Sequence, residues 1–183
     1  FTVGSAGSFT FTGTGLPAPT FALSGCAPAL PATVTLAGAV LSGTPITGNG
    51  GAYVCTLTAS NGVGTNATQT FTLNINQPPA ITSAATTTFN VGSANSITFT
   101  ASGFPASTFS LSGCAPALPV SISLSAGVLS GNPTAGDGGT YACTLTASNG
   151  VGTNATQAFT LSISLPPTIP SANSATFTVG SPG

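Results

Sequence analysis

The sequence predicts an all-β protein made of tandem antiparallel β-sandwich domains, each holding one disulfide bond. Three observations lead to this prediction: an internal repeat, short segments in which apolar residues alternate with Thr and Ser, and two cysteines in each repeat. The 183 residues also include 24 glycines and 15 prolines. Both residue types weaken helices, so long helices are not expected.

The internal repeat has a period of 88 residues, because Cys26 recurs as Cys114 and Cys55 recurs as Cys143 without insertion or deletion. About two-thirds of the paired positions are identical, which indicates recent duplication within an array. We therefore expect a first repeat at residues 1–78 that lacks its first strand, a complete repeat at 79–166, and the opening segment of a third repeat at 167–183.

The complete repeat shows about seven short strands separated by turns rich in Gly and Pro, as in a β-sandwich. Alternation is clearest in Tyr141–Ala147 and Phe159–Ile163, where every second residue is apolar. A period of two is typical of strands with one buried face. The predicted strands are Thr88–Val91, Ile97–Ala101, Thr108–Leu111, Ile122–Leu124, Val128–Leu129, Thr140–Ala147 and Ala158–Ser164, with a tight turn at Gly136–Gly139.

Two proline pairs, Pro78-Pro79 and Pro166-Pro167, stand at equivalent junctions between repeats. Proline cannot donate to a sheet and favours stiff extended backbone, so these pairs predict short, semi-rigid linkers. The missing first strand of the first repeat has two explanations. The expected one is that the chain is a window cut from a continuous array. The alternative is strand donation between chains, in which Ile169–Thr176 supplies what Ile81–Thr88 supplies in the complete repeat.

The four cysteines fall 29 residues apart in each repeat, which predicts the disulfides Cys26–Cys55 and Cys114–Cys143. The alternative is a pair of buried thiols in each repeat. A bridge that closes a loop of this length stabilises a domain by about 3–4 kcal/mol in the chain-entropy model. Disulfides persist in oxidising compartments, so we expect an extracellular, cell-surface protein.

The segment Asp137-x-Gly139-x-Tyr141-x-Cys143 resembles the D-x-G-x-Y-x-C signature of immunoglobulin-type domains. The resemblance implies a tyrosine corner at Tyr141, and at Tyr53 of the first repeat, where Asn49 replaces the acidic residue. The sequence has no Trp, and the partner cysteine lies too near for the usual bridge between sheets. The bridge is therefore expected to join this strand to the end of a middle strand.

A wider set of motifs resembles the tandem immunoglobulin-like and cadherin-like repeats of large bacterial extracellular surface proteins. These motifs are Leu118-Pro119, Gly127–Thr134, Gly139-Thr140-Tyr141 and Leu145–Gly150, with counterparts in the first repeat. The resemblance implies modules of adhesins, stalks and fibres. The calcium sites of cadherin-like relatives are not expected here, because Asn61 and Asn149 stand where those relatives often have Asp.

Composition excludes several classes of function. The chain has no Lys, Arg or His, and Asp137 is its only charged side chain. A lone carboxylate provides neither an acid–base pair nor a catalytic triad, so we expect no enzyme and no catalytic residues. The same inventory predicts no metal site, no cofactor and no nucleic-acid partner. No run of about 18 apolar residues appears, so no membrane span is expected.

These observations favour a structural repeat unit of an extracellular filament, stalk or surface layer, whose partners are copies of itself. The alternative is an adhesin or carbohydrate-binding module of a cell-surface or virion protein. Glycans are a further candidate partner, because Asn66-Ala67-Thr68 and Asn154-Ala155-Thr156 are glycosylation sequons. The alternative interpretation of each sequon is an ordinary Thr on a β-strand.

Overall fold

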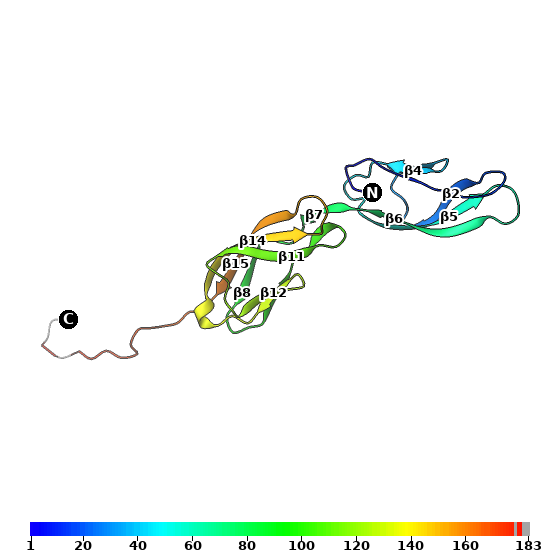
Figure 1. The fold of residues 1–183 in the computed structure, drawn as a ribbon. Coiled ribbons are helices and arrows are strands. Elements are labelled where there is room, and N and C mark those ends of the chain that lie inside the picture. Colours follow the sequence, from blue (N-terminus) through cyan, green and yellow to red (C-terminus); the bar gives the residue numbers. More distant parts are fainter. Residues whose placement is uncertain (178, 181–183) are drawn as a thin grey trace.

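The computed structural model describes residues 1–177 and 179–180, and Figure 1 shows them as two β domains lying end to end. Beyond residue 164 the described part of the chain has no strand and runs away from the second domain (Figure 1). Residues 178 and 181–183, which belong to the predicted opening of a third repeat, lie outside the described residues. None of the described residues belongs to a helix with the length and hydropathy needed to cross a membrane.

The first domain is a sandwich of two three-stranded antiparallel sheets. One sheet has the order β1-β4-β3, and the other has the order β2-β5-β6. Side chains alternate along β5, where Tyr53, Cys55 and Leu57 are buried and the residues between them face outward. The strands are β1 (Gly7–Thr10), β2 (Thr20–Ala27), β3 (Val34–Ala37), β4 (Val40–Gly43), β5 (Gly51–Ser60) and β6 (Ala67–Ile75).

The second domain repeats this sandwich and adds strands at its edges. Its sheets have the orders β12-β13-β9 and β11-β14-β15-β8, and a two-stranded sheet joins β10 to β7. The elements are β7 (Gln77–Ile81), β8 (Thr86–Asn90), β9 (Asn95–Thr98), β10 (Ala101–Phe104), β11 (Thr108–Ala115), β12 (Ile122–Ser125), β13 (Val128–Gly131), the 3-10 helix η1 (Ala135–Asp137), β14 (Gly139–Ser148) and β15 (Ala155–Ser164). The predicted all-β class, tandem sandwiches and one disulfide per domain are confirmed.

One strand pair departs from the antiparallel expectation. β8 pairs with β15 in parallel, with Thr86 opposite Thr160 and Asn90 opposite Ser164. Parallel neighbours need a long connection, and most of the second domain lies between these two strands along the chain. The first domain keeps a remnant of this pairing, a single parallel bridge between Thr2 and Asn76.

Two sequence predictions for the second domain were wrong. Pro78 and Pro79 lie within β7, which pairs antiparallel with β10, so they are not a linker outside the sheets. β7 is an edge strand with one neighbour, where a proline without an N–H is tolerated. The predicted strand Ile97–Ala101 is split, because β9 pairs with β13 whereas β10 pairs with β7.

The two cores are built on phenylalanine rings, because the sequence has no Trp. Phe99 meets Phe159 edge to face, with 5.0 Å between ring centroids. The equivalent rings of the first domain, Phe11 and Phe71, are 4.9 Å apart in a similar arrangement. Such edge-to-face pairs add to the free energy gained by burying the rings. The repeat in sequence is thus also a repeat in core packing.

Candidate functional site

The disulfide of each domain joins two neighbouring strands of one sheet. Cys26 of β2 is bonded to Cys55 of β5, and Cys114 of β11 is bonded to Cys143 of β14. In both domains the first cysteine lies at an irregularity in the strand pairing. The bridge therefore joins the end of an edge strand, β2 or β11, to the long strand that pairs with it, β5 or β14. Residues Cys55 and Cys143 are buried, so the bridge lies against the core.

Each long strand also begins with a tyrosine that holds the preceding turn. The Tyr141 hydroxyl donates to the backbone oxygen of Asp137 at 2.7 Å. The Tyr53 hydroxyl donates to the backbone oxygen of Asn49 at 2.9 Å. Both rings are buried in the cores, so each hydroxyl ties a surface turn to a fixed point in the domain. This is the tyrosine-corner geometry that the sequence motif implies.

Asp137 organises the turn through its side chain. Its Oδ2 atom accepts hydrogen bonds from the Thr134 N–H at 2.7 Å, the Thr134 hydroxyl at 2.9 Å and the Ser121 hydroxyl at 2.9 Å. The bonds from Thr134 and then Ser121 lower the pKa of the Asp137 carboxyl, and slight desolvation opposes them weakly. The only charged side chain of the chain is thus part of a turn.

In the first domain the uncharged side chain of Asn49 holds the equivalent turn. Its Oδ1 atom accepts hydrogen bonds from the Ile46 N–H at 3.0 Å and the Thr33 hydroxyl at 3.3 Å. The change from Asp to Asn therefore keeps the acceptor position that holds the turn. Sequence reasoning treated this position as a loss and missed the hydroxyl partner, which comes from a distant loop.

Gln77 connects the two domains. Its side-chain Oε1 atom accepts hydrogen bonds from the N–H groups of Gly48 and Gly50 in the first domain, at 2.9 and 3.2 Å. Its backbone oxygen accepts a hydrogen bond from Asn149 Nδ2 of the second domain at 2.8 Å. Gln77 is only 8% exposed. One buried residue is therefore hydrogen-bonded to both domains.

Close packing around Pro78 supports this junction. A Cβ atom at Gly152 would lie 2.9 Å from Pro78 Cγ, and one at Gly103 would lie 2.9 Å from the Pro78 oxygen. Gly103 also has a φ of +122°, which only glycine adopts without strain. The first strand of the second domain, β7, is thus packed closely against strand β10 and against the loop between β14 and β15.

Asn149 and Asn61, the positions compared with calcium ligands, act as hydrogen-bond donors. Asn149 Nδ2 donates to the backbone oxygens of Gln77 and Pro105, and Asn61 Nδ2 donates to that of Pro17 at 3.0 Å. Within the described residues, no three His, Cys, Asp or Glu side chains are grouped as they would be around a metal ion.

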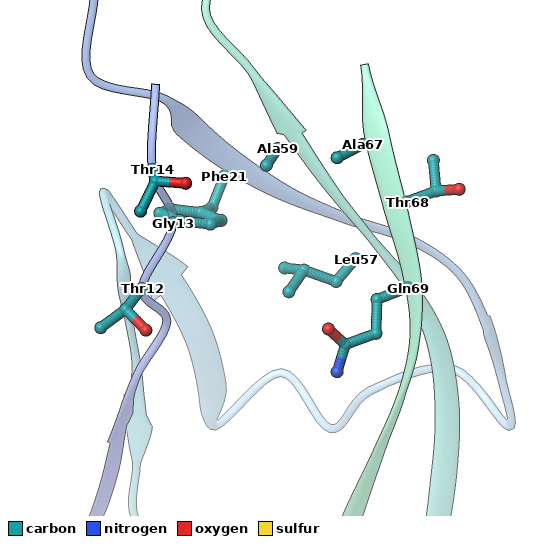
Figure 2. Close-up of a pocket in the computed structure, with 9 residues that line it drawn as sticks. All are labelled: Thr12, Gly13, Thr14, Phe21, Leu57, Ala59, Ala67, Thr68 and Gln69. Atoms are coloured by element: carbon teal, nitrogen blue, oxygen red, sulfur yellow. The ribbon is translucent and has the colours of Figure 1, made fainter. Parts of the chain in front are cut away.

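The first domain carries a groove between the segment that follows β1 and the start of β6. Figure 2 shows it between residues 12–14 and β6, with Phe21 and Leu57 between them. The groove has a volume of about 240 Å³. A smaller hollow beside it, of about 170 Å³, is lined by Phe9, Phe11 and Phe71 among others. The sequence predicts a first repeat that lacks its first strand, but it does not identify these side chains. The larger groove is lined by Thr12, Gly13, Thr14, Phe21, Leu57, Ala59, Ala67, Thr68 and Gln69.

The remaining predicted positions lie on the surface. Asn66 is exposed in the loop between β5 and β6, and Asn154 is exposed in the loop between β14 and β15. Both sequon asparagines are therefore accessible to a modifying enzyme. Pro166 and Pro167 are exposed in irregular backbone after β15. The two proline pairs are therefore equivalent in sequence but differ in structure, since Pro78 and Pro79 lie in strand β7 and the later pair lies in no strand.

A family model described as "Putative Ig domain" (He_PIG) matches residues 1–76 and again residues 78–164. No curated protein matches the chain. Among solved structures, Dpr2 Ig1-Ig2, solved in complex with DIP-Theta Ig1-Ig3, gives a TM-score of 0.58 at 20% identity, covering 88% of this chain and 60% of that chain. The insect immune protein hemolin gives 0.41 at 19% identity, covering 90% and 44%.

A third structure, the endo-fucoidan hydrolase MfFcnA4 of glycoside hydrolase family 107, gives a TM-score of 0.46 at 19% identity and covers 89% of this chain and 27% of that chain. The chain spans less than two thirds of each of these three structures. At these identities the comparison with Dpr2 supports the fold alone. The two matches of the family model cover nearly all of the two domains, one match to each. The chain therefore belongs to the He_PIG family of immunoglobulin-like domains, as a tandem pair.

Proposed function

We propose that the chain is a non-catalytic structural repeat unit of an extracellular filament, stalk or surface layer. The observation that carries this proposal is the junction at Gln77. Its side chain is bonded to the first domain and its backbone to the second, so the two domains are held in one relative orientation. A load-bearing repeat needs such a connection, whereas independent modules are usually joined by flexible linkers.

The internal fastening of each domain supports the same role. Pulling on the chain loads the first and last strands, and the disulfides Cys26–Cys55 and Cys114–Cys143 keep 29-residue loops closed if strands separate. The bridges also favour an oxidising, extracellular setting. We also propose that the domain boundaries lie near residues 78 and 166 and that a third repeat starts at residue 167.

The nearly neutral surface suits an assembled protein. A net charge of −1 provides little repulsion between copies, which favours association over dispersal. The single carboxylate, that of Asp137, is hydrogen-bonded within a turn, and the proposal assigns it no catalytic role.

Labelling of intact cells tests the proposed location and assembly together. An antibody raised against this chain should label the outer surface of intact cells of the source organism in continuous fibres or a continuous layer. Labelling that appears only after the cells are permeabilised would contradict the proposal. Antibody absorbed with the purified chain serves as the control.

An adhesin or carbohydrate-binding module is the second candidate, and one observation favours it. Phe9 is 47% exposed, and its ring lies 5.4 Å from that of Phe71 beside the smaller hollow. Exposed aromatic rings can stack on sugars. Binding of the chain to immobilised glycans, lost on Phe9→Ala, would favour this function over the structural one. Phe9→Leu keeps the apolar volume without an aromatic face and is the matched control.

A further inference from the structure

Three asparagines of the chain, Asn49, Asn61 and Asn149, are followed directly by glycine. In this dipeptide asparagine loses ammonia readily, because glycine has no side chain that shields its backbone nitrogen from the asparagine Cγ atom. The Asn-Gly pairs of Asn49 and Asn149 lie at the junction between the domains, and each is hydrogen-bonded to Gln77. One buried residue is therefore in contact with two reactive dipeptides.

The reaction at Asn149 is a cyclisation followed by hydrolysis. The Gly150 nitrogen loses its proton and forms a bond to Asn149 Cγ, while the bond from Cγ to Nδ2 breaks and the amide leaves with that proton as ammonia. Water then opens the succinimide ring at one of its two carbonyls, which gives aspartate or isoaspartate. The only co-reactant is water, so the reaction is open to a chain that has no Lys, Arg or His.

The local turn keeps the two reacting atoms of this site close together. The Val151 N–H donates to Asn149 Oδ1 at 3.1 Å. This bond closes an Asx turn, a small ring of atoms that contains both Asn149 Cγ and the Gly150 nitrogen. Gly150 is exposed and has a φ of +75°, so it lies in a surface turn outside the sheets. Whether the reaction proceeds then depends on the leaving amide.

The junction holds the leaving amide of Asn149 in place. Its Nδ2 atom donates to the Gln77 oxygen at 2.8 Å and to the Pro105 oxygen at 2.9 Å. An amide NH₂ has two N–H donors, so both are engaged. A Cβ atom on Gly103 would lie 3.1 Å from this nitrogen, so the amide also packs against the backbone of β10. Ammonia can leave only after both hydrogen bonds break, which requires the loop after β14 to move away from β7.

At Asn49 the junction holds the attacking nitrogen instead. The Gly50 N–H donates to Gln77 Oε1 at 3.2 Å. A Cβ atom on Gly50 would lie 2.6 Å from Gln77 Cβ, so the glutamine side chain lies directly on this glycine. Gln77 is buried, and its contact with Gly50 keeps hydroxide from the proton that the nitrogen has to lose.

We propose that Asn49-Gly50 and Asn149-Gly150 are sites of spontaneous deamidation that the closed junction keeps unreactive, and that deamidation of Asn149 holds the junction open. Movement of the second domain away from Gln77 frees the Asn149 amide, and withdrawal of the Gln77 side chain frees the Gly50 nitrogen. This chemistry goes beyond the proposed structural function and does not depend on it, because it requires only the junction.

The product at position 149 cannot restore the closed junction. A carboxylate only accepts hydrogen bonds, and it would face the carbonyl oxygens of Gln77 and Pro105, which are acceptors too. The chain has no Lys or Arg that could neutralise the new negative charge. Isoaspartate also inserts its Cβ atom into the main chain and so displaces the turn. Deamidation of Asn149 is therefore a one-way opening of the junction.

The product at position 49 should leave its turn intact. The equivalent residue, Asp137, holds the same turn of the second domain with a carboxylate oxygen that accepts hydrogen bonds from Thr134 and Ser121. Aspartate is thus already compatible with this position of the repeat. Of the two reactions, only that of Asn149 changes how the domains are held together.

Incubation of the full 183-residue chain in mildly alkaline buffer, either native or unfolded in urea, tests the protection. Tandem mass spectrometry of chymotryptic peptides reports the reaction at each asparagine. In urea, Asn61 and Asn149 should react at the same rate, because residues 55–69 and 143–157 are identical. In the native chain, Asn49 and Asn149 should react at least about tenfold more slowly than in urea. Equal rates in the two states, or no reaction at these sites in urea, would overturn the proposal.

Gln77→Ala separates the two protected sites. It removes the acceptor of the Gly50 N–H, whereas the pairing of residue 77 with Phe104 keeps the backbone oxygen that holds Asn149. The native chain should then react about fivefold faster at Asn49 and at an unchanged rate at Asn149. Gln69→Ala, which truncates an exposed glutamine of β6, is the matched control and should change neither rate. An unchanged rate at Asn49 in Gln77→Ala would rule out protection by this side chain.

Asn149→Asp tests what the reaction does to the junction. Residual dipolar couplings should give the native chain one alignment tensor for both domains and should give Asn149→Asp two different tensors. Asn154→Asp adds the same charge at an exposed position of the same loop and should keep one shared tensor. A shared tensor in Asn149→Asp would show that the product fits the closed junction, and different tensors in both variants would show that charge on the loop suffices. Either result would refute the one-way opening.

Discussion

The tyrosine hydroxyls show how one atom can matter in domains with small cores. Tyr141→Phe removes the hydroxyl that donates to the Asp137 oxygen and leaves that partly buried acceptor without its partner. We expect the second domain to lose about 1–2 kcal/mol of unfolding free energy, measured by urea denaturation. The exposed Thr144→Ala on the same strand is the control and should change stability little. An unchanged urea midpoint for Tyr141→Phe would contradict a role for this bond.

Because of Asp137, we expect the unfolding free energy of the second domain, but not that of the first, to fall at acid pH. Its hydrogen bonds lower the carboxyl pKa in the folded state, so its contribution to stability is fully present above the unfolded pKa of about 4. That contribution is lost as the pH falls through the lower, folded pKa. We expect the urea midpoint to be constant from pH 7 to about pH 5 and to fall below about pH 4. Asp137→Asn should abolish the fall while keeping the fold.

Asn49 explains why that substitution should be tolerated. It already holds the equivalent turn with an amide oxygen, through Ile46 and Thr33. The first domain is thus an internal control, and its stability should not change over the same acid range. A cooperative loss of structure between pH 6 and pH 4, or a gain in stability on acidification, would contradict this account.

At the scale of the strand, we expect the disulfide to contribute more to the unfolding free energy of each domain than any other single interaction. Replacing Cys114 and Cys143 together by Ala should lower the unfolding free energy of the second domain by about 3–4 kcal/mol. The chain has two Tyr and no Trp, so a Tyr53→Phe background lets fluorescence report the second domain alone. Replacing Cys26 and Cys55 in that background is the control, because it affects only the first domain. A loss below about 1 kcal/mol would contradict the loop-closure argument.

The strands that the sequence predicts are those with one buried face and one outward face. Tyr141–Ala147 alternates because one face of β14 packs on the core and the other faces outward, so its pattern alone predicts a strand. The split of Ile97–Ala101 could not be read, because alternation does not tell which sheet a strand joins. β7 was missed because two prolines at its centre are typical of linkers, and only its edge position makes them acceptable.

The repeat predicted the candidate sites more securely than any single motif did. Cysteine pairs, tyrosine corners and the missing strand all follow from comparing positions 88 residues apart. Gln77 could not be recognised in this way, because its counterpart in the next repeat is Leu165, an apolar residue. Its role depends on backbone N–H groups at Gly48 and Gly50, which no sequence pattern displays.

At the scale of the whole molecule, two hydrogen bonds of Asn149 decide whether the domains act as one body. Asn149→Ala removes the donor to the Gln77 oxygen and to the Pro105 oxygen. The fold of each domain should survive, because its core and disulfide are untouched. The relative orientation should become more variable, because Gln77 is then held to the second domain only through the pairing of β7 with β10.

Residual dipolar couplings measure this directly. In the native chain both domains should share one alignment tensor, and in Asn149→Ala the tensor of one domain should shrink relative to that of the other. Asn61→Ala is the matched control, because Asn61 bonds to Pro17 within the first domain and does not contact the second. Equal tensors in Asn149→Ala would contradict a role for Asn149 in holding the two domains in one orientation.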